Sequence, residues 1–330
     1  MRFPFVSAKT KRVLEEQLET AKQKTVAAKE KLKSTQARYE AAKEKLVGQK
    51  AFLEEILRQN EQMKAEVEEA RRINALHTDP RALLSLRFLR GQGLEIGALH
   101  RPTPTAQGTT TRYFDYLSTE ENEKRCSEMI ELGYSLVKVD YIGNAETLET
   151  IADDSLDFII ANHVLEHCQD VIGTLKNFLR KLRKEGALLI SLPDKRYTYD
   201  FKRPITPFEH LIQDHVQGTA QSLYPHYVEA YQSGAFKGVG MAIFEGRLLS
   251  EEELLRDPHV DMHFHVWGQF DMLDLFMRLK REHGFPWEFE GLLRHGGEVV
   301  FALRKETVEE WDRGNPATKP STNEPSLGPP

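Results

Sequence analysis

Cysteine and long apolar runs are both scarce in this chain. Its 330 residues include only Cys126 and Cys168, so neither a disulfide framework nor a cysteine-based zinc site can be assembled. The longest apolar stretches, such as residues 187–192, fall far short of the roughly 18–20 residues that a transmembrane helix needs. The first residues also carry too short an apolar run for a secretory signal. We therefore expect no transmembrane segment and a location in the reducing cytoplasm.

Charge is distributed unevenly along the chain. Residues 1–78 carry 17 Lys and Arg against 12 Asp and Glu, whereas residues 79–330 carry 28 against 39. The second part therefore has a net charge of −11. Such a charge disfavours nucleic acid as a partner, because binding to phosphates depends on clustered cations.

A heptad pattern runs from Leu14 to Ala70 at alternating spacings of four and three, and its positions are mostly apolar or small, with Gln49 and Asn60 among them. Residues 8–76 contain no proline, and Gly48 is their only glycine. The pattern predicts one helix over this range, within a coiled-coil segment 1–78 that forms a homo-oligomer. A solitary charged helix is the alternative. The basic and apolar start of the chain also allows a peripheral contact with the anionic inner membrane.

Residues 79–305 have the alternation of short apolar runs and amphipathic segments that is typical of an α/β domain with a parallel sheet. Residues 194–262 interrupt the alternation and predict an insertion after the fifth strand, and the proline-rich segment 306–330 predicts a disordered tail. We expect helices at 118–133, 171–184 and 270–283. The expected strands are 94–98, 112–116, 136–141, 157–161 and 187–192, followed by a hairpin of 287–294 and 298–303.

The first expected strand leads into a candidate nucleotide site. It carries Glu95 and Gly97, and Asp115 stands at the end of the second strand, where a carboxylate can bind ribose hydroxyls. The glycine-rich pattern of a pyrophosphate site is missing, which disfavours a bound dinucleotide.

Five sequence blocks carry a family resemblance. They are Glu95-Ile96-Gly97, residues 143–148, 154–167, 179–186 and 189–194. Their order and spacing resemble the class I S-adenosylmethionine-dependent methyltransferases of the type 11 group, across about residues 83–304. The resemblance implies a Rossmann-like seven-stranded sheet and S-adenosylmethionine as cofactor. It also implies that the cofactor is bound by residues at four strand ends: Glu95, Gly97, Ala98, Asp115, Asn144, Ala145 and Asn162.

Two positions depart from the family pattern. Ala98 replaces the usual second glycine of the first motif, and Asn144 replaces an acid on the adenine side. Alanine is a small change, and an asparagine side chain still pairs with an exocyclic amine. We expect cofactor binding to be retained.

The sequence His163-Val164-Leu165-Glu166-His167 follows the fourth expected strand. At the start of a helix, its two histidines and its glutamate would share one face. The bare pattern is also that of inverted zinc peptidases, but the flanking methyltransferase blocks disfavour that interpretation.

The segment resembles, more closely, the metal-dependent small-RNA 2′-O-methyltransferases, which have Glu-x-x-Glu-His here and a further histidine four residues before a tryptophan. This resemblance implies His163, Glu166, His167 and His263 as metal ligands. Imidazole in place of the first carboxylate shifts the preference from magnesium toward manganese, iron or zinc. The alternative is that these histidines only cap the turn and line the cofactor pocket.

The insertion is rich in polar and aromatic side chains, which suits a sugar hydroxyl as methyl acceptor. His265, His210 and Asp194 are the candidate catalytic groups, and His265 is also a candidate spare metal ligand. The expected function is O-methylation of a bacterial surface saccharide or its precursor, with glycan-assembly enzymes as partners. O-methylation of a quinone-like small molecule and a catalytically inactive scaffold are the alternatives.

Overall fold

A computed structural model describes residues 8–234, 243–244, 247–248 and 262–307 of the protein. The chain divides into two compact units, residues 1–71 and 72–330, and each is considered by itself. None of the helices within the described residues is long and apolar enough to cross a membrane.

The long helix α1 (Ala8–Thr78) confirms the helix predicted from the heptad pattern. Its apolar seam lies open in the single chain. Leu18, Leu32 and Leu46 are each more than half exposed, so their burial would favour self-association. Oligomer formation through this seam stays a prediction.

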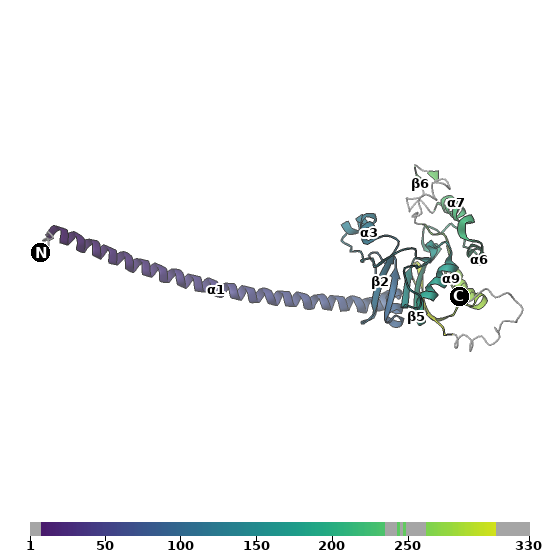
Figure 1. The fold of residues 1–330 in the computed structure, drawn as a ribbon, viewed down its shortest axis with the longest axis horizontal. Coiled ribbons are helices and arrows are strands. Elements are labelled where there is room, and N and C mark those ends of the chain that lie inside the picture. The colour runs from purple at the N-terminus through teal and green to yellow at the C-terminus, as the bar shows by residue number, and fades with distance from the viewer. Residues whose placement is uncertain (1–7, 235–242, 245–246, 249–261, 308–330) are drawn as a thin grey trace. The chain divides into compact units, whose positions relative to one another are not determined.

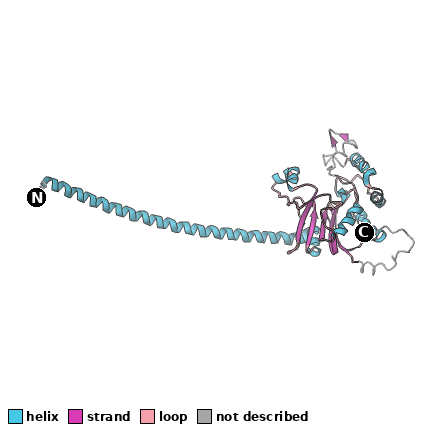
Figure 2. Ribbon diagram, viewed as in Figure 1, coloured by secondary structure: helices cyan, strands magenta, loops and turns pink. Residues whose placement is uncertain are grey.

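A seven-stranded sheet forms the centre of the second unit, in the order β3-β2-β1-β4-β5-β9-β8 (Figures 1 and 2). The first five strands in this order pair in parallel, and β9 pairs antiparallel with β5 and β8. This confirms the Rossmann-like sheet and the closing hairpin. The strands are β1 (Gln92–Ile96), β2 (Thr110–Asp115), β3 (Tyr141–Ile142), β4 (Leu156–Asn162), β5 (Leu182–Pro193), β8 (Trp287–His295) and β9 (Glu298–Lys305).

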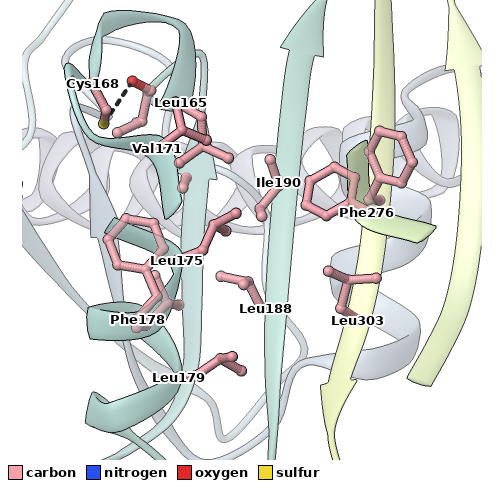
Figure 3. Close-up of a cluster of buried hydrophobic side chains, with 14 of the residues drawn as sticks. Leu165, Cys168, Val171, Leu175, Phe178, Leu179, Leu188, Ile190, Phe276 and Leu303 are labelled. Atoms are coloured by element: carbon pink, nitrogen blue, oxygen red, sulfur yellow. Dashed lines mark hydrogen bonds between the residues drawn. The ribbon is translucent and has the colours of Figure 1, made fainter. Parts of the chain in front are cut away.

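Helices pack on both faces of this sheet. On one face, α5 (Val171–Lys181) and α9 (Gln269–His283) cover the main core. Figure 3 shows α5 side chains facing Leu188 and Ile190 of β5, with Phe276 of α9 beyond them. On the other face, α2 (Pro80–Phe88) packs on a smaller cluster. Because both faces are buried, the sequences of the central strands are nearly continuous apolar runs.

Several element bounds differ from the sequence-based prediction. The third strand is only two residues long, at Tyr141–Ile142 instead of 136–141. The helix expected over 118–133 is divided at Cys126 into α3 (Thr119–Arg125) and α4 (Ser127–Glu131). Only Glu306 and Thr307 of the predicted tail lie within the described residues, and Glu306 is buried beside Lys280.

The insertion after β5 contributes two helices, α6 (Phe208–Gln217) and α7 (Leu223–Ser233). A two-residue pair of strands follows, β6 (Ile243–Phe244) with β7 (Arg247–Leu248). The remainder of 235–261 lies outside the described residues. The buried segment 262–268 then leads into α9 and contacts the carboxyl edge of the sheet through a bridge between Asp194 and Trp267.

Candidate functional site

A buried polar network lies where β1 and β4 end, at the point where the strand order reverses. Glu95 is 1% exposed, and both its oxygens accept from the Thr103 amide at 3.0–3.1 Å. Asn162 Nδ2 donates to Thr103 Oγ1 at 2.8 Å. Burial raises the pKa of Glu95, and the bonds from Thr103 partly offset the rise. Asn162 Oδ1 is buried and accepts no hydrogen bond within the described residues, so it is available to an ammonium donor.

Gly97 and Asp115 flank this network at the same edge. Gly97 has φ +66°, and a Cβ added there would meet only open space, which leaves its backbone accessible to a ligand. Asp115 is 7% exposed at the end of β2, and its Oδ1 accepts from the Leu117 amide at 3.1 Å. Burial raises the pKa of Asp115.

The predicted adenine-side residues form a turn of their own. Asn144 Oδ1 accepts from the Glu146 amide at 2.8 Å, and the Asn144 carbonyl accepts from the Leu148 amide. The Asn144 side chain is therefore engaged in its turn. Ala145 and Ala98 are half-buried, and neither carries a polar side-chain group. Their predicted contact with the cofactor stays a prediction.

The segment after β4 is a tight turn and not the start of an α-helix. His163 has φ +53°, and a 3₁₀ turn covers Leu165–His167. Because of this turn, the side chains of His163, Glu166 and His167 do not share a helix face as predicted. The turn is fixed by the Phe264 amide, which donates to the Glu166 carbonyl at 2.7 Å.

Three of the four predicted metal ligands converge beside this turn. One ligand atom each from Glu166, His167 and His263 lies within 4.8 Å of the others. Glu166 is fully buried, and neither of its oxygens accepts a hydrogen bond of good geometry within the described residues, although His163 Nδ1 lies 3.2 Å from Oε1. Burial raises the pKa of Glu166, but the neighbouring histidines outweigh this and hold it below its usual value. The site presents a buried carboxylate next to two imidazoles.

His167 and His263 are each held by an oxygen that can only accept a hydrogen bond. His263 Nδ1 lies 2.6 Å from Asp200 Oδ2, and His167 Nδ1 lies 2.9 Å from the Met262 carbonyl. In the neutral rings Nδ1 therefore carries the proton and Nε2 the lone pair. A carboxylate or carbonyl behind the imidazole is the usual support of a metal-binding histidine. The buried Arg203 holds Asp200 in turn, at 2.9 Å.

His163, the fourth predicted ligand, is directed elsewhere. Its Nε2 lies 2.8 Å from Glu298 Oε2, and Glu298 also pairs with Arg81 of α2. Burial by itself would lower the pKa of His163, but Glu166 and Glu298 outweigh this and raise it to about 9. The ring therefore bridges two carboxylates as a cation.

Glu298 should make a pH-dependent contribution to stability. Burial alone would raise its pKa, but His163 and Arg81 outweigh this and lower the pKa to about 2. The stabilisation is thus present above the ordinary pKa of 4.5 and is lost as the pH falls toward 2. We expect Glu298→Gln to lower the free energy of unfolding by about 2 kcal/mol at neutral pH and to converge with the parent as the pH falls to about 2.

Urea unfolding across this pH range checks the expectation. Glu290→Gln is the matched control, because Glu290 forms a more exposed pair with Arg304 and should change stability by less than about 1 kcal/mol. A difference between parent and Glu298→Gln that grows on acidification would contradict the assignment.

The three predicted catalytic residues fall into different surroundings. Asp194 is fully buried, and its carboxylate accepts from the Arg196 guanidinium and amide, so it holds a turn. His210 and His265 lie in a separate cluster with Asp214 and His226. Their catalytic roles stay predictions.

Sequence reasoning did not single out several residues that complete these arrangements. Thr103 joins Glu95 to Asn162, Asp200 supports His263, and Glu298 engages His163. Thr103 lies eight residues from Glu95, and the other contacts join residues at least 59 positions apart, so no motif spacing indicated them. His226 is likewise separated from the residues that it meets, whereas Asp214 lies four residues after His210 on α6, a helical spacing that could have indicated it.

Comparisons with known proteins identify a family for this chain. A family model described as a methyltransferase domain matches residues 68–268. No curated protein matches the chain. Among solved structures, a SAM-dependent methyltransferase from Methanosarcina mazei is 16% identical with a TM-score of 0.35, covering 67% of this chain and 95% of that one. One from Aquifex aeolicus is 12% identical with a TM-score of 0.34, covering 70% and 91%.

The family model spans more than half of the chain, and the sheet order and the polar groups at its carboxyl edge fit the donor that this family uses. Asn162 Oδ1 is an unpartnered acceptor among the described residues, the Gly97 backbone is accessible, and Asp115 offers a carboxylate. The chain therefore belongs to the methyltransferase-domain family and is an S-adenosylmethionine-dependent methyltransferase.

Proposed function

We propose that the protein is an O-methyltransferase that methylates a sugar hydroxyl of a bacterial surface glycan or its precursor with the help of a divalent metal. The observation that carries the proposal is the buried Glu166 carboxylate, which has two imidazoles beside it and no good hydrogen-bond donor among the described residues. A buried charge is costly, and the His163 cation beside Glu166 is shared with Glu298, so a bound metal cation would add compensation.

The residues of the site have separable roles in this reaction. Gly97, Asp115 and Asn162 would hold S-adenosylmethionine, which supplies an activated methyl group on its sulfonium. Glu166, His167 and His263 would hold the metal, and a bound metal lowers the pKa of a coordinated hydroxyl. Asp200 fixes the ring orientation and tautomer of His263, because its carboxylate accepts the Nδ1 proton at 2.6 Å.

Oxygen as the methylated atom follows from this ligand set. Two imidazoles and a carboxylate suit manganese, iron or zinc, and such ions bind vicinal sugar hydroxyls through oxygen. The polar insertion supports a saccharide over a quinone, because Lys195, Arg196 and Tyr197 line its first turn with hydrogen-bonding groups. Glycan-assembly enzymes remain the proposed partners.

Three measurements test the proposal. Calorimetry should detect S-adenosylmethionine binding at micromolar concentrations, and elemental analysis should detect a transition metal in the purified protein. Mass spectrometry of envelope glycans from a deletion strain should then show the loss of one methyl group per modified sugar. Unchanged glycans together with methylated small molecules would favour the quinone-like acceptor, and absent cofactor binding would favour an inactive scaffold.

A further inference from the structure

A second cluster of metal-ligand side chains lies in the insertion, apart from the Glu166 trio. His210 and Asp214 come from α6, His226 from α7 and His265 from the segment before α9. One ligand atom of each lies within 4.8 Å of all the others. Four side chains from three separate parts of the chain thus converge on one point.

The spacing of the ligand atoms suits a tetrahedral ion. Ligands about 2.0–2.1 Å from zinc at the tetrahedral angle are about 3.3 Å from one another. His210 Nε2 lies 3.1 Å from His226 Nε2 and 3.0 Å from Asp214 Oδ2. The planes of His226 and His265 are at 86°, and those of His210 and His226 at 85°, so the rings approach the centre from different directions.

Hydrogen bonds within the described residues do not satisfy this cluster. Asp214 and His265 are 3% and 1% exposed, yet Asp214 Oδ2 and His265 Nδ1 have no hydrogen-bond partner there. His265 Nε2 faces the Gln169 carbonyl at 3.2 Å, so Nε2 carries the proton and Nδ1 the lone pair. Asp214 Oδ2 has only the His210 ring beside it, at 3.0 Å, without a hydrogen bond of good geometry, and the His265 lone pair has no hydrogen-bond partner within the described residues. Such a buried oxygen and such a lone pair in one cluster indicate a missing cation.

The surroundings also allow an ion to enter, because His210, Asp214 and His226 line a cavity of about 300 Å³.

We propose that His210, Asp214, His226 and His265 bind one zinc ion that ties α6 and α7 to the segment 262–267. Three imidazoles and one carboxylate are all zinc ligands, and together they complete a four-coordinate shell with no open position, as in a structural zinc site. The ion would hold the insertion against the same segment that carries His263. A ligand role for His210 and His265 replaces the proton-transfer role predicted from sequence, because a metal-bound lone pair cannot accept a proton.

Zinc titration of the chelator-stripped full-length protein tests this site separately from the Glu166 trio. The Glu166→Gln chain, in which the trio is disabled, should still bind one equivalent of zinc and gain about 5 °C in Tm on saturation. The double variant, Glu166→Gln with His226→Gln, should lose both the zinc equivalent and the gain in Tm. Asp214→Asn should weaken zinc binding at least tenfold. His215→Gln is the matched control on α6, because His215 pairs with Asp170 outside the cluster, and its zinc binding should not change.

Each outcome decides between the two metal sites. If the Glu166→Gln chain binds no zinc and its Tm does not respond, the second site is overturned whatever the trio does. If His226→Gln leaves the zinc equivalent in place, the assigned ligands are wrong. If the parent binds one equivalent that Glu166→Gln retains, the second site stands and the metal of the proposed function falls.

Discussion

Replacing Gly97 with alanine should weaken S-adenosylmethionine binding about 100-fold. The residue sits at the carboxyl end of β1 with φ +66°, and the position of its missing Cβ opens onto space with no protein atom within 4 Å. A methyl group there would occupy room that the family resemblance assigns to the methionine end of the cofactor. A 100-fold loss corresponds to about 2.7 kcal/mol of binding free energy, which is readily measured by calorimetry.

Gly108→Ala is the matched control for this change. Gly108 also has a positive φ, +82°, and open space around its missing Cβ, but it precedes β2 and so lies at the opposite edge of the sheet. Both variants should lose about 1–2 kcal/mol of stability, because an L-residue is strained in the left-handed region. Only Gly97→Ala should lose cofactor affinity. Equal affinities in the two variants would remove Gly97 from the binding site.

The fold was predictable because its determinants are local and periodic. The heptad spacing of residues 8–76 predicts α1, and buried apolar runs such as Leu188–Leu192 predict central strands. The third strand was misplaced because residues 136–139 alternate like a strand, yet only Tyr141 and Ile142 pair with β2. Pairing depends on the neighbouring strand, which a single segment does not reveal.

The candidate site was only partly predictable, because some of its contacts join residues that are far apart in the sequence. Glu166 and His167 are close in sequence, and the tryptophan spacing indicated His263. The sequence pattern also placed His163 in the metal site, but its ring bridges Glu166 and Glu298, a carboxylate 135 residues further along the chain. Asp200 supports His263 across 63 residues. Contacts of this range depend on how distant segments of the chain pack together, which no periodic signal in the sequence reveals.

Glu166→Gln should reduce methyl transfer about 10³-fold, or about 4 kcal/mol in activation free energy, while changing S-adenosylmethionine affinity by less than threefold. The amide keeps the shape of the side chain but removes the only charge among the three proposed ligands in their neutral-ring state. The trio should therefore lose its metal, and with it the pKa-lowering effect on the acceptor hydroxyl. Labelled transfer to envelope glycans from a deletion strain measures the rate.

Glu298→Gln separates the metal role of Glu166 from its contact with His163. Both carboxylates lie within ion-pair distance of His163, but only Glu166 belongs to the converging trio. If Glu166 acts as a ligand, Glu298→Gln should retain metal and transfer at 25 °C despite its lower stability. If both variants lose activity equally and neither loses metal, the important group is the His163 cation, because removing either carboxylate then weakens the same charge that holds the turn after β4.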